Sequence, residues 1–149
     1  MLTYAIQKTG DDYSRLDPQG PTDYAGFIGA LEQFPWAAQL ALWDVDQSGP
    51  LPALVLRHTG DQRELWISAL GTDLGQDFQL NAVAMREKKP RFGFGKPSIE
   101  RDVVTFDVES RADVDRLCQL FCSAQYAAFD ADVARLDERS RERERWRRR

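Results

Sequence analysis

The chain has 149 residues, of which 42% are hydrophobic and 30% are charged. This length suits one domain that buries roughly 70% of the surface of its unfolded chain, so no disulfide or metal ion is needed to hold the fold. Eight Phe, four Tyr and four Trp supply a core and exclude wholesale disorder. Since no stretch approaches the roughly 18 apolar residues of a membrane span and no secretory signal is visible, we expect a cytoplasmic protein.

Charge is divided unevenly along the chain. Residues 139–149, RSRERERWRRR, hold seven Arg and two Glu, whereas residues 1–138 hold 13 basic and 22 acidic side chains. We expect a single domain over residues 1–138 and an Arg-rich tail over 139–149, as a frayed helix in which Glu144 reaches Arg148. The tail could clamp nucleic acid or an anionic membrane, or simply be a solvated helix end.

The first third of the chain predicts one strand, one short helix and a second strand. Residues 2–8 read as a strand, and the Asp- and Gly-rich residues 9–21 read as a loop. In residues 22–35 the apolar positions recur at three and four, which predicts a helix capped by Thr22 or Asp23 and stopped by Pro35. The run WAAQLALWDV is predicted to be a strand with Trp36 and Trp43 on opposite faces.

Four further runs of strand length follow, at residues 51–59, 63–70, 77–86 and 101–108. Their short connections favour antiparallel neighbours. Phe78, Leu80 and Ala82 alternate with Gln79 and Asn81, which indicates a sheet with one buried and one wet face.

The last apolar pattern predicts a long helix that packs across this sheet. Ser110 followed by Asp113 resembles a capping box, and apolar residues keep helical spacing as far as Leu136. Cys118 and Cys122 lie one turn apart and are interpreted as core residues, in preference to a disulfide, a redox pair or half a metal site. The predicted fold class is therefore α+β: an antiparallel sheet of five or six strands against a long C-terminal helix, with one short N-terminal helix.

The stretch KKPRFGFGKPS matches no phosphate-binding loop. Pro90 and Pro97 stand where a P-loop needs Gly and a hydroxyl, and the spacing lacks the third glycine of a dinucleotide-binding turn. The RNA-recognition signature fails too, because Phe92 follows Arg91 where Gly is required. We interpret the stretch as a hairpin loop, whose side chains fold back on the core, contact a partner or stack bases.

Nothing in the sequence predicts a catalytic residue, a metal site or a cofactor. His58 is the only histidine and no nucleophile motif accompanies it, so a solvated or hydrogen-bonded strand histidine is favoured. Asp44 and Asp46 could hold a divalent ion, but the QSGP that follows favours a turn.

Partner contacts are predicted in two groups. Trp43 is the candidate anchor, because Trp concentrates binding energy at interfaces. The acidic contacts expected at sheet ends are Asp44, Asp46, Asp73 and Asp77. The alternative contact loop consists of Arg91, Phe92, Phe94 and Lys96.

A helix ending in QFPW, strands containing LWIS, the loop FGFGK and the final VDRLCQLFCSAQYAAFDADVARL together resemble the small immunity proteins that bacteria encode beside polymorphic toxins. The resemblance is strongest over residues 92–136. It implies a non-enzymatic protein that binds one cognate toxin and blocks its active site or substrate groove. An acidic body suits a basic toxin.

Three other functions stay open. A secretion-effector chaperone would also be small and acidic, but such chaperones usually carry a helix between their strands, and GTDLGQ leaves no room for it. A nucleic-acid-binding module would use the loop at residues 91–96 and the Arg-rich tail. An acid–base enzyme built from scattered carboxylates is the least favoured.

Overall fold

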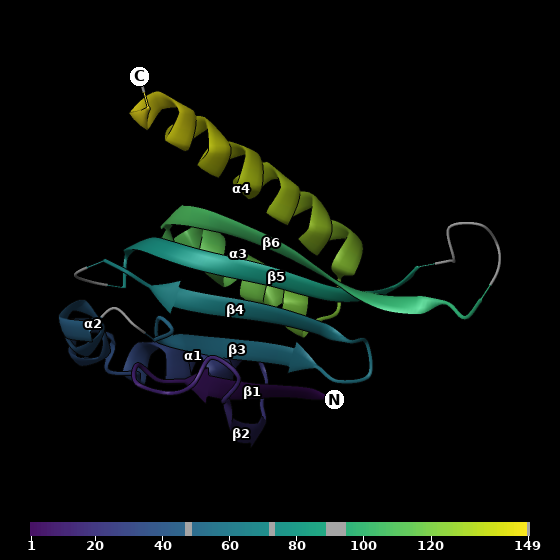
Figure 1. The fold of residues 1–149 in the computed structure, drawn as a ribbon, viewed down its shortest axis with the longest axis horizontal. Helices are drawn as coiled ribbons and strands as arrows, with labels where there is room; N and C mark the ends of the chain where they lie inside the picture. The colour runs from purple at the N-terminus through teal and green to yellow at the C-terminus, as the bar shows by residue number, and fades with distance from the viewer. Residues whose placement is uncertain (47–48, 72–73, 89–94, 149) are drawn as a thin grey trace.

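Six strands form one fully antiparallel sheet in the order β2-β1-β3-β4-β5-β6 (Figure 1). The computed structural model describes residues 1–46, 49–71, 74–88 and 95–148. The strands are β1 Leu2–Gln7, β2 Asp17–Pro21, β3 Ala53–His58, β4 Arg63–Ala69, β5 Gln76–Lys88 and β6 Ser98–Ser110. The helices are α1 Tyr24–Gln33, α2 Trp36–Asp46, α3 Arg111–Cys122 and α4 Tyr126–Arg147. The predicted α+β class and the antiparallel sheet are confirmed.

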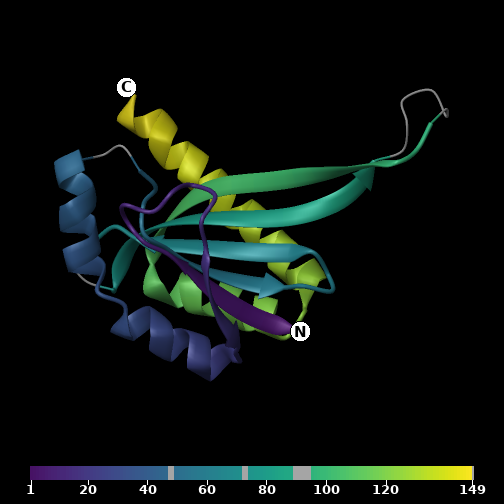
Figure 2. The same ribbon diagram turned by 60° about the horizontal axis from the view of Figure 1, so that its bottom comes forward.

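One face of the sheet is buried beneath α1, α3 and α4 (Figure 2). Side chains alternate along a strand, so Leu65, Ile67, Phe78 and Leu80 all point to the helices and are almost completely buried. They join one apolar cluster that includes Phe121 of α3. The opposite face is not covered by these helices.

Residues 36–45 are helical, so the prediction of a strand there was wrong. Ala, Leu and Gln, which fill this run, are strong helix formers, but its nearly continuous apolar character hides the period. The Trp36 indole donates to the carbonyl of Leu31 at 2.8 Å, which turns α2 back against the end of α1. Trp36 is buried and Trp43 is half-buried, and they do not lie on opposite faces of a strand.

The predicted long C-terminal helix is two helices. α3 ends at Cys122, and Ala124 adopts a left-handed conformation with φ 56° before α4 begins. No Gly or Pro marks this break, which is why the sequence did not reveal it. The cap is confirmed, since the Ser110 hydroxyl accepts from the amide of Ala112 at 3.2 Å. Residues 17–21, expected to be loop, form the edge strand β2.

α4 continues through the Arg-rich segment to Arg147, and the predicted pair of Glu144 with Arg148 is present at 3.0 Å. Its last turns lie beside the free edge of β6. Ser140 Oγ accepts from the amide of Asp107 at 3.0 Å, and Arg143 donates to the carbonyl of Asp107 at 2.7 Å. Exposed strand edges invite unwanted pairing, so these two bonds close part of the edge.

Both cysteines are free thiols, as expected for core residues. Burial raises the pKa of Cys118 well above its ordinary value. Burial and the charge of Asp23 raise the pKa of Cys122 to about 11. Both thiols therefore stay protonated at neutral pH.

Within the described ranges, no helix is both long enough and apolar enough to cross a membrane.

Asp132 joins α3 to α4 through two arginines. Its carboxylate accepts from Arg116 at 3.0 Å and from Arg135 at 2.9 Å, and both arginines also reach Asp113. The Asp132 side chain is only 12% exposed. Burial by itself would raise its pKa, but the hydrogen bonds from Arg116 and Arg135 outweigh burial and hold the pKa below the ordinary 3.8.

We expect Asp132→Asn to lower the free energy of unfolding by about 1–2 kcal/mol, since it removes a carboxylate bonded to two half-exposed arginines. The lowered folded-state pKa makes this contribution present above pH 3.8 and lost as the pH falls further. Urea unfolding at pH 7 and pH 3 measures it. Asp137→Asn, at a simpler α4 ion pair with the exposed Arg141, is the control and should cost less than ~0.5 kcal/mol. Equal losses at both pH values would contradict the assignment.

Candidate functional site

The open face of the sheet carries two complete rows of side chains across the strands. One row runs from β1 to β6 through Ala5, Val55, Trp66, Asn81 and Thr105. The next row runs through Thr3, Arg57, Glu64, Val83 and Val103. Because directly opposite residues in antiparallel strands point the same way, both rows lie on this face. Ala5, Val55 and Val83 are buried within it.

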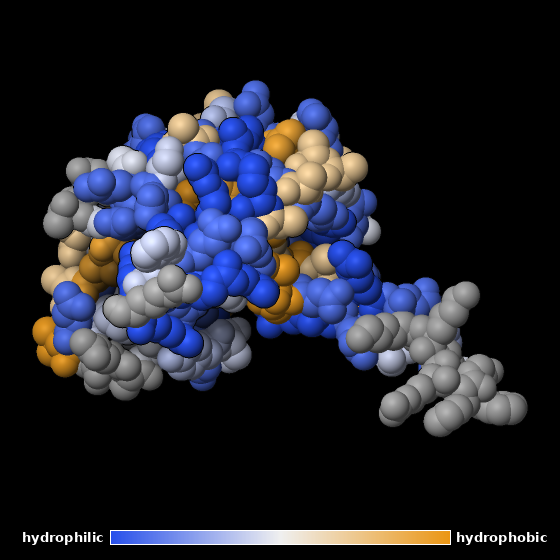
Figure 3. Space-filling view, turned by 90° about the horizontal axis from the view of Figure 1, so that it is seen from above, coloured by the Kyte–Doolittle hydropathy of each residue, from blue (hydrophilic) through white to orange (hydrophobic). Residues whose placement is uncertain are grey.

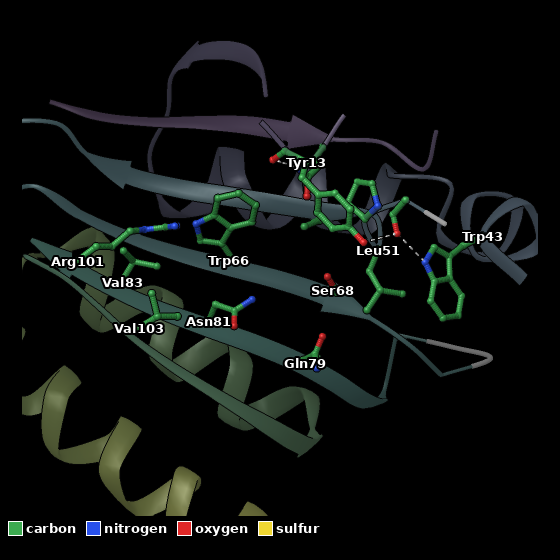
Figure 4. A pocket seen from close by; sticks show the side chains of 14 residues that line it. Tyr13, Trp43, Leu51, Trp66, Ser68, Gln79, Asn81, Val83, Arg101 and Val103 are labelled. Carbon is green, nitrogen blue, oxygen red and sulfur yellow. Dashed lines mark hydrogen bonds between the residues drawn. The ribbon is translucent and has the colours of Figure 1, made fainter. Parts of the chain in front are cut away.

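A hollow of about 590 Å³ lies on this face and is called the sheet hollow below. Its floor is formed by residues of β4, β5 and β6, and its wall by Tyr13, Trp43 and residues 49–51 (Figure 4). The Tyr13 hydroxyl and the Trp43 indole both donate to the carbonyl of Gly49, each at 3.2 Å. This shared carbonyl fixes α2 and the β1–β2 loop above one end of the sheet.

The floor of the sheet hollow is rich in amide and hydroxyl groups. Gln79 and Asn81 stand two residues apart on β5 and point into it (Figure 4). The Asn81 carbonyl oxygen accepts from the hydroxyl of Thr105. Ser68 and Gln7 are buried, and the Gln7 amide donates to the carbonyl of Tyr13 at 3.0 Å. Groups of this kind can match the donors and acceptors of a peptide backbone.

Arg101 adds a charge to the floor, and Glu64 and Arg57 lie next to it on the same face. Glu64 lies 2.9 Å from Arg57 Nε as an ion pair without hydrogen-bond geometry, and it accepts from the Trp66 indole at 3.0 Å. Arg101 Nη2 lies 3.9 Å from the same carboxylate, with its side chain 52% exposed. Glu64 thus holds the ring of Trp66 in place while Arg101 remains accessible from solvent.

Apolar side chains continue from Val103, at the rim of the hollow, onto a neighbouring part of the same face. β5 and β6 pair with each other as far as Lys88 and Ser98, whereas β4 pairs with β5 only as far as Ala84. The parts of β5 and β6 that extend beyond β4 form an arm, residues 85–88 and 98–101, which projects from the sheet (Figures 1 and 2). Ile99 on this arm is 68% exposed and Val103 at its base is 46% exposed.

The structure brings one predicted contact residue, Trp43, into the wall of the sheet hollow. Asp44 is exposed on α2 and not at the end of a strand. Asp46 ends α2, and its side chain lies outside the described set. Asp77 is exposed at the start of β5, where its carbonyl accepts from the amide of Leu70 at 2.8 Å.

The predicted contact loop is described only in part. Lys96 is exposed between the arm strands. The remaining predicted contacts lie outside the described residues: Asp73, Arg91, Phe92 and Phe94.

Sequence reasoning missed Trp66, Gln79, Asn81 and Arg101 as site residues. A signal existed, because the alternation that places Phe78 and Leu80 in the core places Gln79 and Asn81 on the wet face. What the sequence lacked was the wall: the position of Tyr13 and Trp43 depends on contacts between distant segments.

His58 and Tyr126 lie on the helix-covered side, away from the hollow. His58 Nε2 is 2.7 Å from the carbonyl of Phe121, which confirms the hydrogen-bonded strand histidine. Burial, together with a 2.6 Å hydrogen bond to Asp61, raises the pKa of Tyr126. In the part of the chain that the structure describes, no three His, Cys, Asp or Glu side chains are grouped to hold a metal ion.

The chain matches no protein-family model, no curated protein and no solved structure.

We expect Glu64→Gln to lower the free energy of unfolding by about 1 kcal/mol, because it leaves Arg57 and Arg101 without their shared carboxylate. Urea unfolding followed by circular dichroism measures the change. Glu87→Gln, at an exposed position on the arm, is the matched control and should change stability by less than ~0.5 kcal/mol. An unchanged midpoint for Glu64→Gln would show that this carboxylate does not organise the floor.

Proposed function

We propose that this chain is a non-enzymatic binding protein that neutralises a cognate protein toxin through the open face of its sheet. The observation that carries the proposal is the sheet hollow, with its aromatic wall, amide floor and apolar extension along the arm. The resemblance to immunity proteins in the QFPW, LWIS and FGFGK stretches supports the same class of function.

The chemistry of the face suits a protein more than a small molecule. Trp, Tyr and Arg are the residues that most often dominate the energy of protein interfaces, and Trp66, Tyr13 and Arg101 supply one of each. Gln79 and Asn81 offer both donors and acceptors to a peptide backbone. The exposed Val103 and Ile99 widen the apolar area toward the size of a protein contact. The occupant that fits is a loop or strand of the toxin, laid between the wall and the arm.

A nucleic-acid partner is less favoured, because four arginines of the Arg-rich segment are already paired within the chain. Arg141, Arg143, Arg145 and Arg148 each form an ion pair with an acidic side chain. The side of the molecule that carries α4 is mostly hydrophilic (Figure 3). Ion pairs of Arg141 and Arg145 place both signs of charge along this helix. Charges paired in this way release fewer counterions from a phosphate backbone than free cations do.

The test uses Val103→Arg, which places a long cation on the open face, and Ala128→Arg, which places the same side chain at an exposed position of α4. Both variants should keep the circular dichroism spectrum of the parent chain. Immobilised parent chain and Ala128→Arg should capture the same protein from a lysate of the source cells, and Val103→Arg should weaken its binding at least tenfold.

The captured protein is then expressed alone and together with each chain, and growth is measured. We expect growth arrest that the parent chain and Ala128→Arg relieve and that Val103→Arg does not. A captured protein that arrests nothing would refute the neutralising function, and equal relief by Val103→Arg would refute the open face as its site.

A further inference from the structure

Helix α2 is apolar on both of its sides, although the chain buries only one of them. Trp36 and Trp43 lie on the inner side. The outer side presents an exposed strip at helical spacing, called the α2 outer strip: Ala38, Ala41, Leu42 and Val45. Leu42 is 56% exposed and Val45 is 88% exposed. A helix that is apolar all round is normally buried all round, so the strip lacks a covering surface within the described chain.

The sequence around the α2 outer strip is acidic. Residues 16–56 contain no Lys, Arg or His but include five acidic residues. Glu32 is paired with Arg111, whereas Asp44 is exposed beside the strip. A surface that combines apolar area with positive charge therefore complements the strip and Asp44.

The carboxyl end of α4 has this combination. Trp146 is 74% exposed, and its sequence neighbours Arg145, Arg147 and Arg148 are exposed too. Arg145 and Arg148 also pair with Glu138 and Glu144, but six Arg against two Glu leave residues 139–148 with a net positive charge. This end of the helix therefore offers apolar area and positive charge together. Residues 145–148 are called the α4 end below.

We propose that two copies of this chain form a dimer in which the α4 end of each covers the α2 outer strip of the other. Within one chain the two surfaces are clearly separate in Figure 1. Both lie at the same end of the molecule in Figures 1 and 2, so a single two-fold axis beside that end can make both contacts.

A second copy is favoured over another basic protein because the chain itself supplies both complementary halves. A two-fold axis makes the contact twice, which doubles the area buried and closes the assembly. This dimer uses neither the sheet hollow nor the arm, so it does not depend on the proposed neutralising function.

The test measures the mass of the full chain by sedimentation over a range of concentrations and salt. We expect a dimer whose dissociation constant rises with salt and rises at least tenfold in Val45→Arg and in Trp146→Ser. Both positions are exposed, so both variants should fold, and circular dichroism checks this. Val103→Arg on the open face is the control and should dimerise like the parent chain.

A mixture of the two variants, carrying different tags, makes the test specific. A mixed dimer contains two contacts. In one of them the intact α2 outer strip of the Trp146→Ser chain meets the intact α4 end of the Val45→Arg chain, so mixed dimers should form more tightly than dimers of either variant alone. A parent chain that is monomeric at every concentration would overturn the proposal, as would single variants that keep the parent mass. Mixing without any gain would overturn the reciprocal contact.

Discussion

The burial of a single face of the antiparallel sheet is the constraint on which the rest of the structure depends. Leu65, Ile67, Phe78 and Leu80 turn toward the helices, where Phe121 and its neighbours meet them. The period of two then forces every intervening residue of β4 and β5 onto the opposite face. Slipping either strand by one residue would exchange the two sets, burying polar groups without partners, so the core also fixes the candidate site.

A second layer of contacts gives the open face its shape. A flat sheet surface has no hollow; the wall exists because Tyr13 and Trp43 converge on the carbonyl of Gly49. The indole of Trp36 anchors the beginning of α2 to the end of α1, so the wall is held at both ends of the helix. Aromatic side chains with a polar atom suit this role, because their rings pack while their donors satisfy buried carbonyls.

Side chains at the carboxyl end of the chain also bond to the backbone of a neighbouring element. The last turns of α4 close part of the β6 edge through Ser140 and Arg143, and the arginines there find acidic partners. The Arg-rich segment is therefore an ordered helix end and not a free polycationic tail, and it exposes Trp146. The molecule therefore has two surfaces of different chemistry. One is the open sheet face with its aromatic and amide groups. The other is the end of the molecule where the α2 outer strip, beside Asp44, and the α4 end, with Trp146 and its arginines, both face solvent.

The sequence by itself determined the α+β class, five of the six strands, the antiparallel sense of four of them, the Ser110 cap and the stop at Pro35, because these follow from local periodicity and backbone chemistry. It also determined which residues of β5 are wet, although it did not mark Gln79 and Asn81 as a site. Only the tertiary structure decided that residues 36–45 are a helix, that the last helix breaks at Ala124 and that residues 17–21 join the sheet. In each of these cases the pattern along the sequence was ambiguous, and packing against the rest of the chain selected the conformation.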